Sequence, residues 1–181
     1  MKSKILFKKP VFDIMSFIFN NPTGEFYEKK VADITKISVG ACNKYMKKLS
    51  EIGFFKVEKR GKMNFYRLNR ENVLVKRLKI IFTLDSPLVN EIKEKIKGER
   101  TEIFLYGSFA RGEDVEDSDF DVLLITTREK HDEIATKLRK IGERYKKKIS
   151  IAYFTRDDWI KMKIKDPAFY ERVEKDKIRL I

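Results

Sequence analysis

Two short apolar runs in the second half of the chain, residues 103–106 and 120–125, most strongly limit what it can fold into. Runs of this length and composition are typical of strands that lie buried inside a sheet. A third run of this kind, residues 148–154, follows a helical pattern over residues 131–145. Because helical segments alternate with these three strands, the second half is predicted to form an α/β layer structure.

The first half has apolar residues at helical spacing in three segments, residues 11–19, 29–35 and 39–52. Ser38 is a suitable N-cap for the third helix, and Gly53 follows it in the position of a terminating glycine. The inward stripe expected on this third helix consists of Val39, Cys42, Met46, Leu49 and Ile52. Its opposite face then carries Gly40, Asn43, Lys44, Lys47 and Lys48.

A β-hairpin is predicted to follow the third helix, because residues 54–68 change to strand periodicity around a turn at residues 59–62. A further helix is expected over about residues 71–82. Over residues 11–85 this succession resembles the prokaryotic winged helix-turn-helix regulators. The resemblance implies that the third helix enters the major groove of duplex DNA while the hairpin contacts the backbone.

Candidate DNA contacts follow from the side chains that this resemblance places toward the duplex. Asn43 can read adenine, and Lys44, Lys47 and Lys48 can meet guanine or phosphate. At the hairpin, the cations suited to phosphates are Lys59, Arg60 and Lys62. The alternative is that the first domain mediates dimerisation or protein docking, with its lysine face simply solvated.

The distribution of charge separates the two halves of the chain. Residues 1–85 contain 19 Lys and Arg against 8 Asp and Glu, a net charge of +11. Residues 86–181 contain 22 against 20, a net charge of only +2. Such an imbalance favours a polyanionic partner for the first half. A lysine-rich surface of the kind that thermophilic proteins favour is the alternative, but it accounts only for the balanced second half.

A glycine and a serine between the first two predicted strands form the first half of a candidate site. Gly107 and Ser108 follow the strand at residues 103–106 and open a helical turn. Glycine lets a phosphate approach the backbone, where N–H groups and the Ser108 hydroxyl can bind it. Arg111 lies three residues after Ser108, on the same face of a helix, and can also reach a phosphate.

Two aspartates form the other half of the candidate site. Asp119 and Asp121 are two residues apart on a predicted strand, so their carboxylates project from one face. Such a pair can hold a divalent cation that bridges phosphate oxygens. Taken singly, a Gly-Ser turn is common, and the six acidic residues between Glu113 and Asp121 could form only a solvated loop. A calcium loop starting at Asp117 is excluded, because it needs glycine sixth and glutamate twelfth.

Together, the segments Gly107-Ser-Phe-Ala-Arg-Gly112 and Ser118-Asp-Phe-Asp121 resemble the polymerase-β-like nucleotidyltransferases, within them the minimal nucleotidyltransferases of prokaryotes. The resemblance implies a short mixed sheet flanked by helices, a nucleoside triphosphate bound by Gly107 and Ser108, and Mg²⁺ or Mn²⁺ held by Asp119 and Asp121 as catalytic residues. It also implies attack of a hydroxyl on the α-phosphate, with a toxin-type protein, another protein or a small molecule as acceptor.

One position departs from that family pattern. Active members carry a third carboxylate within a later strand, and Ser150 stands at the matching position of residues 148–152. A serine is neither an anionic ligand nor a strong base. Asp157 and Asp158 lie beyond the strand and would have to reach back. Two functions therefore remain open: a nucleotidyltransferase, or a DNA-binding transcriptional regulator whose second domain binds nucleotide or partners without catalysis.

The remaining composition excludes several classes of protein. With Cys42 and His131 as its only cysteine and histidine, the chain has no disulfide framework and no Cys/His zinc site, and is a poor match to a Ser-His-Asp enzyme. Neither a signal peptide nor a membrane-spanning run is evident. We expect a cytoplasmic protein of two domains, residues 1–85 and 86–181, which can form a homodimer.

Overall fold

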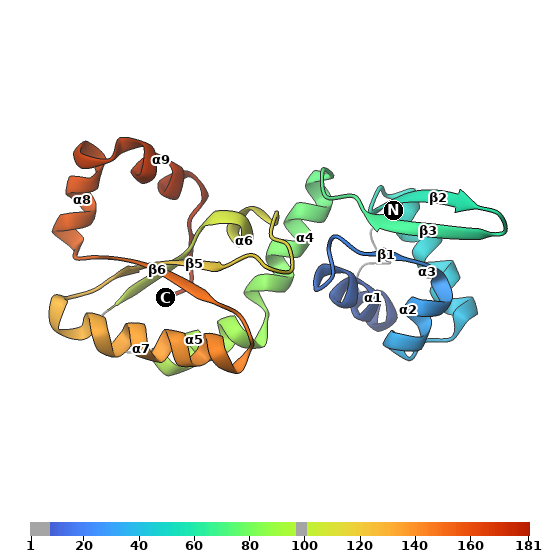
Figure 1. Cartoon of the computed structure of the whole chain (residues 1–181), viewed down its shortest axis with the longest axis horizontal. Coiled ribbons are helices and arrows are strands. Elements are labelled where there is room, and N and C mark those ends of the chain that lie inside the picture. The colour runs from blue at the N-terminus through green and yellow to red at the C-terminus, as the bar shows by residue number, and fades with distance from the viewer. Residues whose placement is uncertain (1–7, 97–100) are drawn as a thin grey trace. The chain divides into compact units, whose positions relative to one another are not determined.

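The computed structural model describes residues 8–96 and 101–181. The chain divides into two compact units, Met1–Lys79 and Ile80–Ile181, each with a sheet of its own (Figure 1). The boundary between the units along the chain falls within helix α4 (Val73–Leu84), a few residues before the boundary after residue 85 that the sequence predicts. The sequence also predicts a helix over residues 88–96 that ends at Lys97 and Gly98, and these two residues lie outside the described part of the chain. No helix among the described residues is long and apolar enough to cross a membrane.

The first unit packs three helices against a small antiparallel sheet of order β1-β3-β2. Besides α4, its elements are α1 (Lys9–Phe19), β1 (Glu25–Phe26), α2 (Glu28–Thr35), α3 (Val39–Glu51), β2 (Phe55–Arg60) and β3 (Met63–Leu68). The predicted caps of α3 are confirmed, since the Ser38 side chain accepts a hydrogen bond from the Ala41 amide and Gly53 has a φ of +78°. Short β1 carries no period-2 signal, which is why the sequence did not predict it.

The predicted inward stripe of α3 is confirmed over its middle. Cys42, Met46 and Leu49 are fully buried. The prediction is wrong for Val39, whose side chain is 49% exposed. Val39 is the first residue of the helix, so its side chain lies one turn before the buried part of the stripe begins.

The predicted hairpin is confirmed, with β2 and β3 paired over six residues from Phe55 and Leu68 out to Arg60 and Met63. Only its base belongs to the core, because β2 is buried at Phe55 alone. The turn is shorter than the sequence indicated, since Arg60 is still the last residue of β2. Gly61 takes the positive φ of +59° that reverses the chain.

The second unit is a mixed four-stranded sheet of order β6-β5-β4-β7 with helices on both faces. Its elements are α5 (Pro87–Ile96), β4 (Glu102–Leu105), α6 (Gly107–Arg111), β5 (Phe120–Ile125), α7 (Arg128–Arg144), β6 (Ile149–Phe154), α8 (Arg156–Lys165), α9 (Pro167–Asp176) and β7 (Ile178–Arg179). Strands β5 and β6 are parallel and the other pairs antiparallel. The mixed sheet is therefore confirmed, and two-residue β7 is an addition to the predicted strands.

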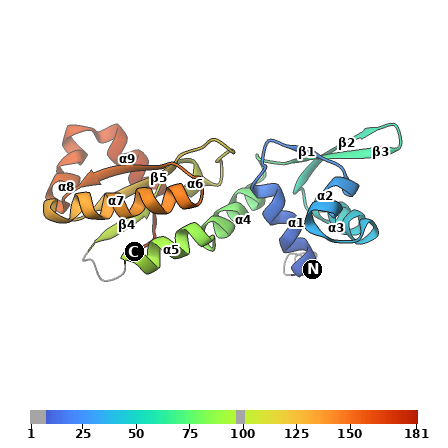
Figure 2. The same ribbon diagram turned by 60° about the horizontal axis from the view of Figure 1, so that its bottom comes forward.

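Each face of this sheet has its own core. Helices α5 and α7 lie along one face (Figure 2), over side chains such as Val122 and Leu124. Helices α8 and α9 cover the other face, where Leu123 and Ile125 pack against Trp159. Because side chains alternate along a strand, Asp121 lies on the face that α8 and α9 cover.

Candidate functional site

Strand register brings the ends of β4, β5 and β6 together at one edge of the second unit's sheet. Leu105 pairs with Val122 in the antiparallel direction, and Asp121 pairs with Ser150 in the parallel direction. Just past β4, the Tyr106 amide donates a hydrogen bond to the Asp121 carbonyl oxygen over 3.0 Å. The turn after β4, the start of β5 and the start of β6 therefore meet at this edge.

Gly107 is in direct contact with the side chain of Asp121. A Cβ atom at Gly107 would lie 2.2 Å from Asp121 Oδ2, and the residue has a φ of +73°. Both the space and the backbone conformation therefore require glycine. The Gly-Ser turn and the aspartate pair, separate in the sequence, therefore lie side by side in the structure.

The two aspartates lie where β5 begins, two residues apart. Asp119 directly precedes β5, Asp121 is its second residue, and both are half-buried. Burial raises the pKa of the Asp121 carboxyl, and the neighbouring Asp119 carboxylate raises it further, while Arg111 and Lys148 act in the opposite direction. Two carboxylates held this close repel each other unless a cation lies beside them.

A cation that the sequence analysis did not identify lies beside the pair. Lys148 Nζ donates to Asp119 Oδ2 over 2.7 Å, and this hydrogen bond raises the pKa of the lysine. Lys148 stands two residues before Ser150, as Asp119 stands two residues before Asp121. A parallel register between β5 and β6 was the signal that could have found it.

Ser150 occupies the place beside Asp121 on the neighbouring strand, as the predicted position of the missing third carboxylate requires. Asp157 and Asp158 do not replace it. They begin α8 at the far end of β6, about 16 Å along the strand at ~3.3 Å per residue, and the Asp158 carboxylate accepts a hydrogen bond from Thr155 Oγ1. Among the described residues, no group of three or more acidic, histidine or cysteine side chains could hold a metal.

Arg111 has partners other than those the sequence predicted. Its Nε donates to Glu113 over 2.8 Å and its Nη1 to Asp176 over 3.0 Å. Because this guanidinium is hydrogen-bonded to these two carboxylates, its effect on Asp121 is electrostatic, and its charge lowers the pKa of the Asp121 carboxyl. Ser108 is half-buried in α6, and its carbonyl oxygen accepts from the Glu113 amide over 2.9 Å.

Tyr106 is a second side chain at this edge that sequence reasoning missed, because it reads only as the end of an apolar run. Burial raises the pKa of its phenol, and the charge of Asp121 raises it further. Its ring packs edge-on against Phe169 of α9, with the centroids 6.2 Å apart. Tyr106 thus packs against the core beneath α9 and also lies close enough to Asp121 for its charge to act on the phenol.

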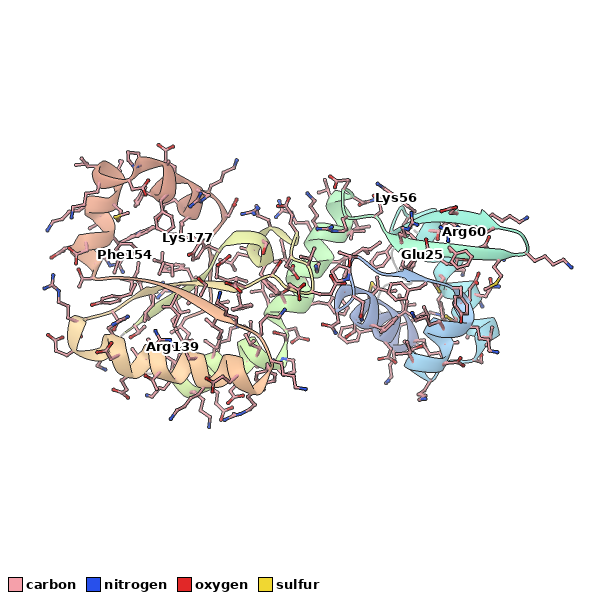
Figure 3. All side chains as sticks on the ribbon, viewed as in Figure 1. Glu25, Lys56, Arg60, Arg139, Phe154 and Lys177 are labelled. Carbon is pink, nitrogen blue, oxygen red and sulfur yellow. The ribbon has the colours of Figure 1, made fainter. Side chains whose placement is uncertain are left out.

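The candidate DNA contacts of the first unit fall into two groups. All are exposed to solvent except Asn43, which is half-buried, but Arg60 differs from the exposed lysines in its contacts. Arg60, labelled with Glu25 in Figure 3, differs from the predicted tip cation, because its guanidinium binds both Glu25 and Glu58. It also lies 4.6 Å from the centre of the Phe65 ring. Arg60 therefore stabilises the outer face of the sheet.

The sequence of the second unit matches a known protein family. The model of the nucleotidyltransferase domain matches residues 86–180, just over half of the chain. This chain belongs to the nucleotidyltransferase-domain family. The match includes every residue of the candidate site at the sheet edge, which we call the edge site and which consists of Tyr106, Gly107, Ser108, Asp119, Asp121, Lys148 and Ser150. A comparison with curated proteins and one with solved structures yielded no match.

The edge site of this nucleotidyltransferase domain suits a divalent cation with a bound triphosphate. Mg²⁺ is commonly held by one or two carboxylates together with substrate phosphates and water. Asp119 and Asp121 could supply those carboxylates, and Gly107 lets the Asp121 carboxylate lie against the Gly-Ser turn, where any other residue would place a Cβ atom. The Lys148 ammonium, which now neutralises Asp119, would have to give up this contact to the cation.

Proposed function

We propose that the second unit transfers a nucleotide from a nucleoside triphosphate to a hydroxyl acceptor, with Mg²⁺ or Mn²⁺ held by Asp119 and Asp121. The contact between Gly107 and Asp121 carries this proposal, because it joins the phosphate-binding turn to the aspartate pair. The family match to residues 86–180 supports the reaction class.

In this proposal the backbone at Gly107 and Ser108 and the Ser108 hydroxyl bind the triphosphate and orient its α-phosphate. The acceptor oxygen forms a bond to the α-phosphorus while the bond to the bridging oxygen breaks, and pyrophosphate leaves. The cation, when bound, neutralises the charge on the phosphate oxygens. Ser150 is too weak a base to take the proton of the acceptor hydroxyl, so this proton passes to water.

The position of Ser150 favours a second function. It stands in register with Asp121 where the related family pattern has a third carboxylate. A domain that lacks this carboxylate can bind a metal–triphosphate, but it catalyses the transfer slowly or not at all. The chain would then be a regulator whose second unit senses a nucleotide.

For the first unit we propose a winged helix-turn-helix that binds duplex DNA. The element order α1-β1-α2-α3-β2-β3 and the antiparallel sheet β1-β3-β2 support it. So does α3, which buries Cys42, Met46 and Leu49 and turns Lys44 and Lys47 to solvent. Lys59 and Lys62 are exposed near the turn of the hairpin, where they can meet phosphates.

Thermal unfolding with Mg²⁺ and each nucleoside triphosphate tests the site, because a ligand that binds only the folded state raises the melting temperature. We expect Asp121→Asn to abolish the shift and Ser108→Ala to reduce it, since the backbone N–H groups remain. Asp157→Asn, at the far end of β6, is the matched control and should keep the full shift. No shift with any metal–triphosphate pair would exclude both functions.

Release of pyrophosphate by the wild-type chain separates the two candidates. Turnover with a cell lysate as the source of acceptor would establish the transferase. Binding without release would instead establish the sensor, and Ser150→Asp should then introduce measurable release, because it restores a carboxylate beside Asp121.

A further inference from the structure

A basic cleft opens at the same edge of the second unit's sheet as Asp119. It has a volume of about 420 Å³ and is lined by Arg139, Glu143, Lys146, Lys147, Lys148 and Ile149. The lining comes from the last turns of α7, where Figure 3 labels Arg139, and from the segment that leads into β6. Four cations thus face one carboxylate within this cleft.

The excess of charge in the cleft is local. Residues 139–148 contain six Lys and Arg and a single acidic residue, in a half of the chain whose net charge is only +2. Basic side chains near the C-terminal end of α7 interact favourably with the helix dipole. Arg144, in the last turn, already does so, and it is paired with Glu91. Within residues 8–96 and 101–181, neither Arg139 nor Lys146 takes part in an ion pair, and both are exposed.

Lys148 links the cleft to the aspartate pair. Lys148 lines the cleft and its Nζ lies 2.7 Å from Asp119 Oδ2. Lys147 also lines it, and its Nζ donates to the Glu116 carbonyl oxygen over 2.9 Å, in the loop that leads to Asp119. A row of phosphates in the cleft would therefore end next to the site where we place the nucleotide transfer.

We propose that this cleft binds the phosphodiester backbone of a nucleic-acid strand whose terminal hydroxyl is the acceptor. This inference rests on the proposed transfer function and names its acceptor class. Nucleic-acid interfaces are strongly positive, whereas the centres of protein interfaces are apolar and depleted in lysine. The single apolar residue of the lining, Ile149, is 8% exposed, so an acidic protein would find no apolar anchor here.

The test uses the full chain with Lys44→Glu and Lys47→Glu, so that the proposed DNA face of the first unit does not contribute. Binding of a labelled single-stranded oligonucleotide is followed by fluorescence anisotropy over a range of salt. Adding Arg139→Glu and Lys146→Glu should weaken binding roughly tenfold or more and lower the salt slope by about 0.7 for each lost phosphate contact. Adding Lys163→Glu and Lys165→Glu, two exposed lysines near the end of α8, is the control of equal charge and should leave binding unchanged.

Equal losses in both variants would overturn the proposal, because they would report only the net charge of the chain. Absence of strand binding before the cleft is altered would overturn it as well. The shift of melting temperature by metal–triphosphate is measured alongside and should persist in the cleft variant. Its loss there would assign the cleft to the triphosphate instead of the acceptor. Its absence in every variant would reject the transfer function while leaving strand binding to be judged separately.

With a labelled nucleoside triphosphate, the chain with the unaltered cleft should transfer label to the oligonucleotide. The Arg139→Glu, Lys146→Glu variant should not transfer it. Transfer of label to a protein, unaffected by that variant, would show that the acceptor docks elsewhere and would overturn the proposal.

Discussion

The two units use their lysines in different ways. In the first unit Lys44 and Lys47 are exposed on the face of α3 opposite its buried stripe, and neither takes part in an ion pair within residues 8–96 and 101–181. In the second unit Lys148 is tied to Asp119, and its charge belongs to a cluster of opposite signs. Net charge thus predicts a polyanionic partner for the first unit, but it predicts little about the partner of the second. There, only the arrangement of nearby charges carries information.

The largest effect expected is a test of whether the two units are energetically separate. Leu49→Ala removes a fully buried side chain from α3 and should lower the free energy of unfolding of the first unit by about 2–5 kcal/mol. The second unit should melt as in the wild type, because both of its cores are built from its own residues. Scanning calorimetry of the full chain measures both transitions. Lys47→Ala is the control and should change stability by less than about 0.5 kcal/mol.

A single cooperative transition that shifts as a whole in Leu49→Ala would contradict the independence of the units. A larger loss from Lys47→Ala than from Leu49→Ala would mean that the face of α3 assigned to DNA is instead its packing face.

The second test concerns the exposed charges of α3. Reversing Lys44 and Lys47 to Glu should raise the Kd for duplex DNA at least about a hundredfold, equivalent to about 2.7 kcal/mol, because phosphates then meet anions. Gel retardation at low salt measures it, and wild-type affinity should fall with salt by about 0.9 log units per neutralised phosphate. Reversing Lys163 and Lys165 on α8 is the matched change in the other unit. It should leave duplex binding intact, and equal losses would refute a localised DNA face.

The third test compares a glycine from each unit. Gly107 and Gly61 both have a positive φ, but only Gly107 would place a Cβ against another residue. Gly61→Ala should therefore cost only the backbone strain, about 1–2 kcal/mol. Gly107→Ala should cost more, and it should also abolish stabilisation by metal–triphosphate, because the Asp121 carboxylate must move. Chemical denaturation gives both costs, and equal values would mean that the contact with Asp121 is easily relieved.

The smallest effect expected is electrostatic. Because the pKa of Asp121 is raised, its contribution to stability is complete below its ordinary pKa of 3.8 and is lost as pH rises through the raised value. Asp121→Asn should therefore raise the melting temperature of the metal-free second unit by a few degrees at neutral pH, and this gain should vanish in acid. Asp119→Asn removes the partner of Lys148 and should give no such gain. Similar gains from both variants would show that repulsion within the pair outweighs the contact with Lys148.

Local patterns in the sequence were sufficient wherever neighbouring residues determine a structure. The Ser38 cap, the Gly53 stop and the buried face of α3 follow from spacing of three and four residues and from cap chemistry. The pair Asp119 and Asp121 follows from the two-residue period of a strand. Two-residue strands such as β1 and β7 carry no period of their own, so they appear only once a neighbouring strand supplies hydrogen bonds.

By itself, the sequence determined that this protein has a basic half with helices and a hairpin. It also determined a balanced half in which buried strands alternate with helices, with a Gly-Ser turn and an aspartate pair. Only the tertiary structure decided which of these charges act together. The parallel register of β5 and β6 sets Lys148 beside Asp119 and Ser150 beside Asp121. Strand pairing in the first sheet allows Arg60 to form an ion pair with Glu25, and the packing of α9 allows Arg111 to form one with Asp176. Such contacts join residues far apart along the chain, so they depend on strand register and helix packing, which local periodicity does not encode.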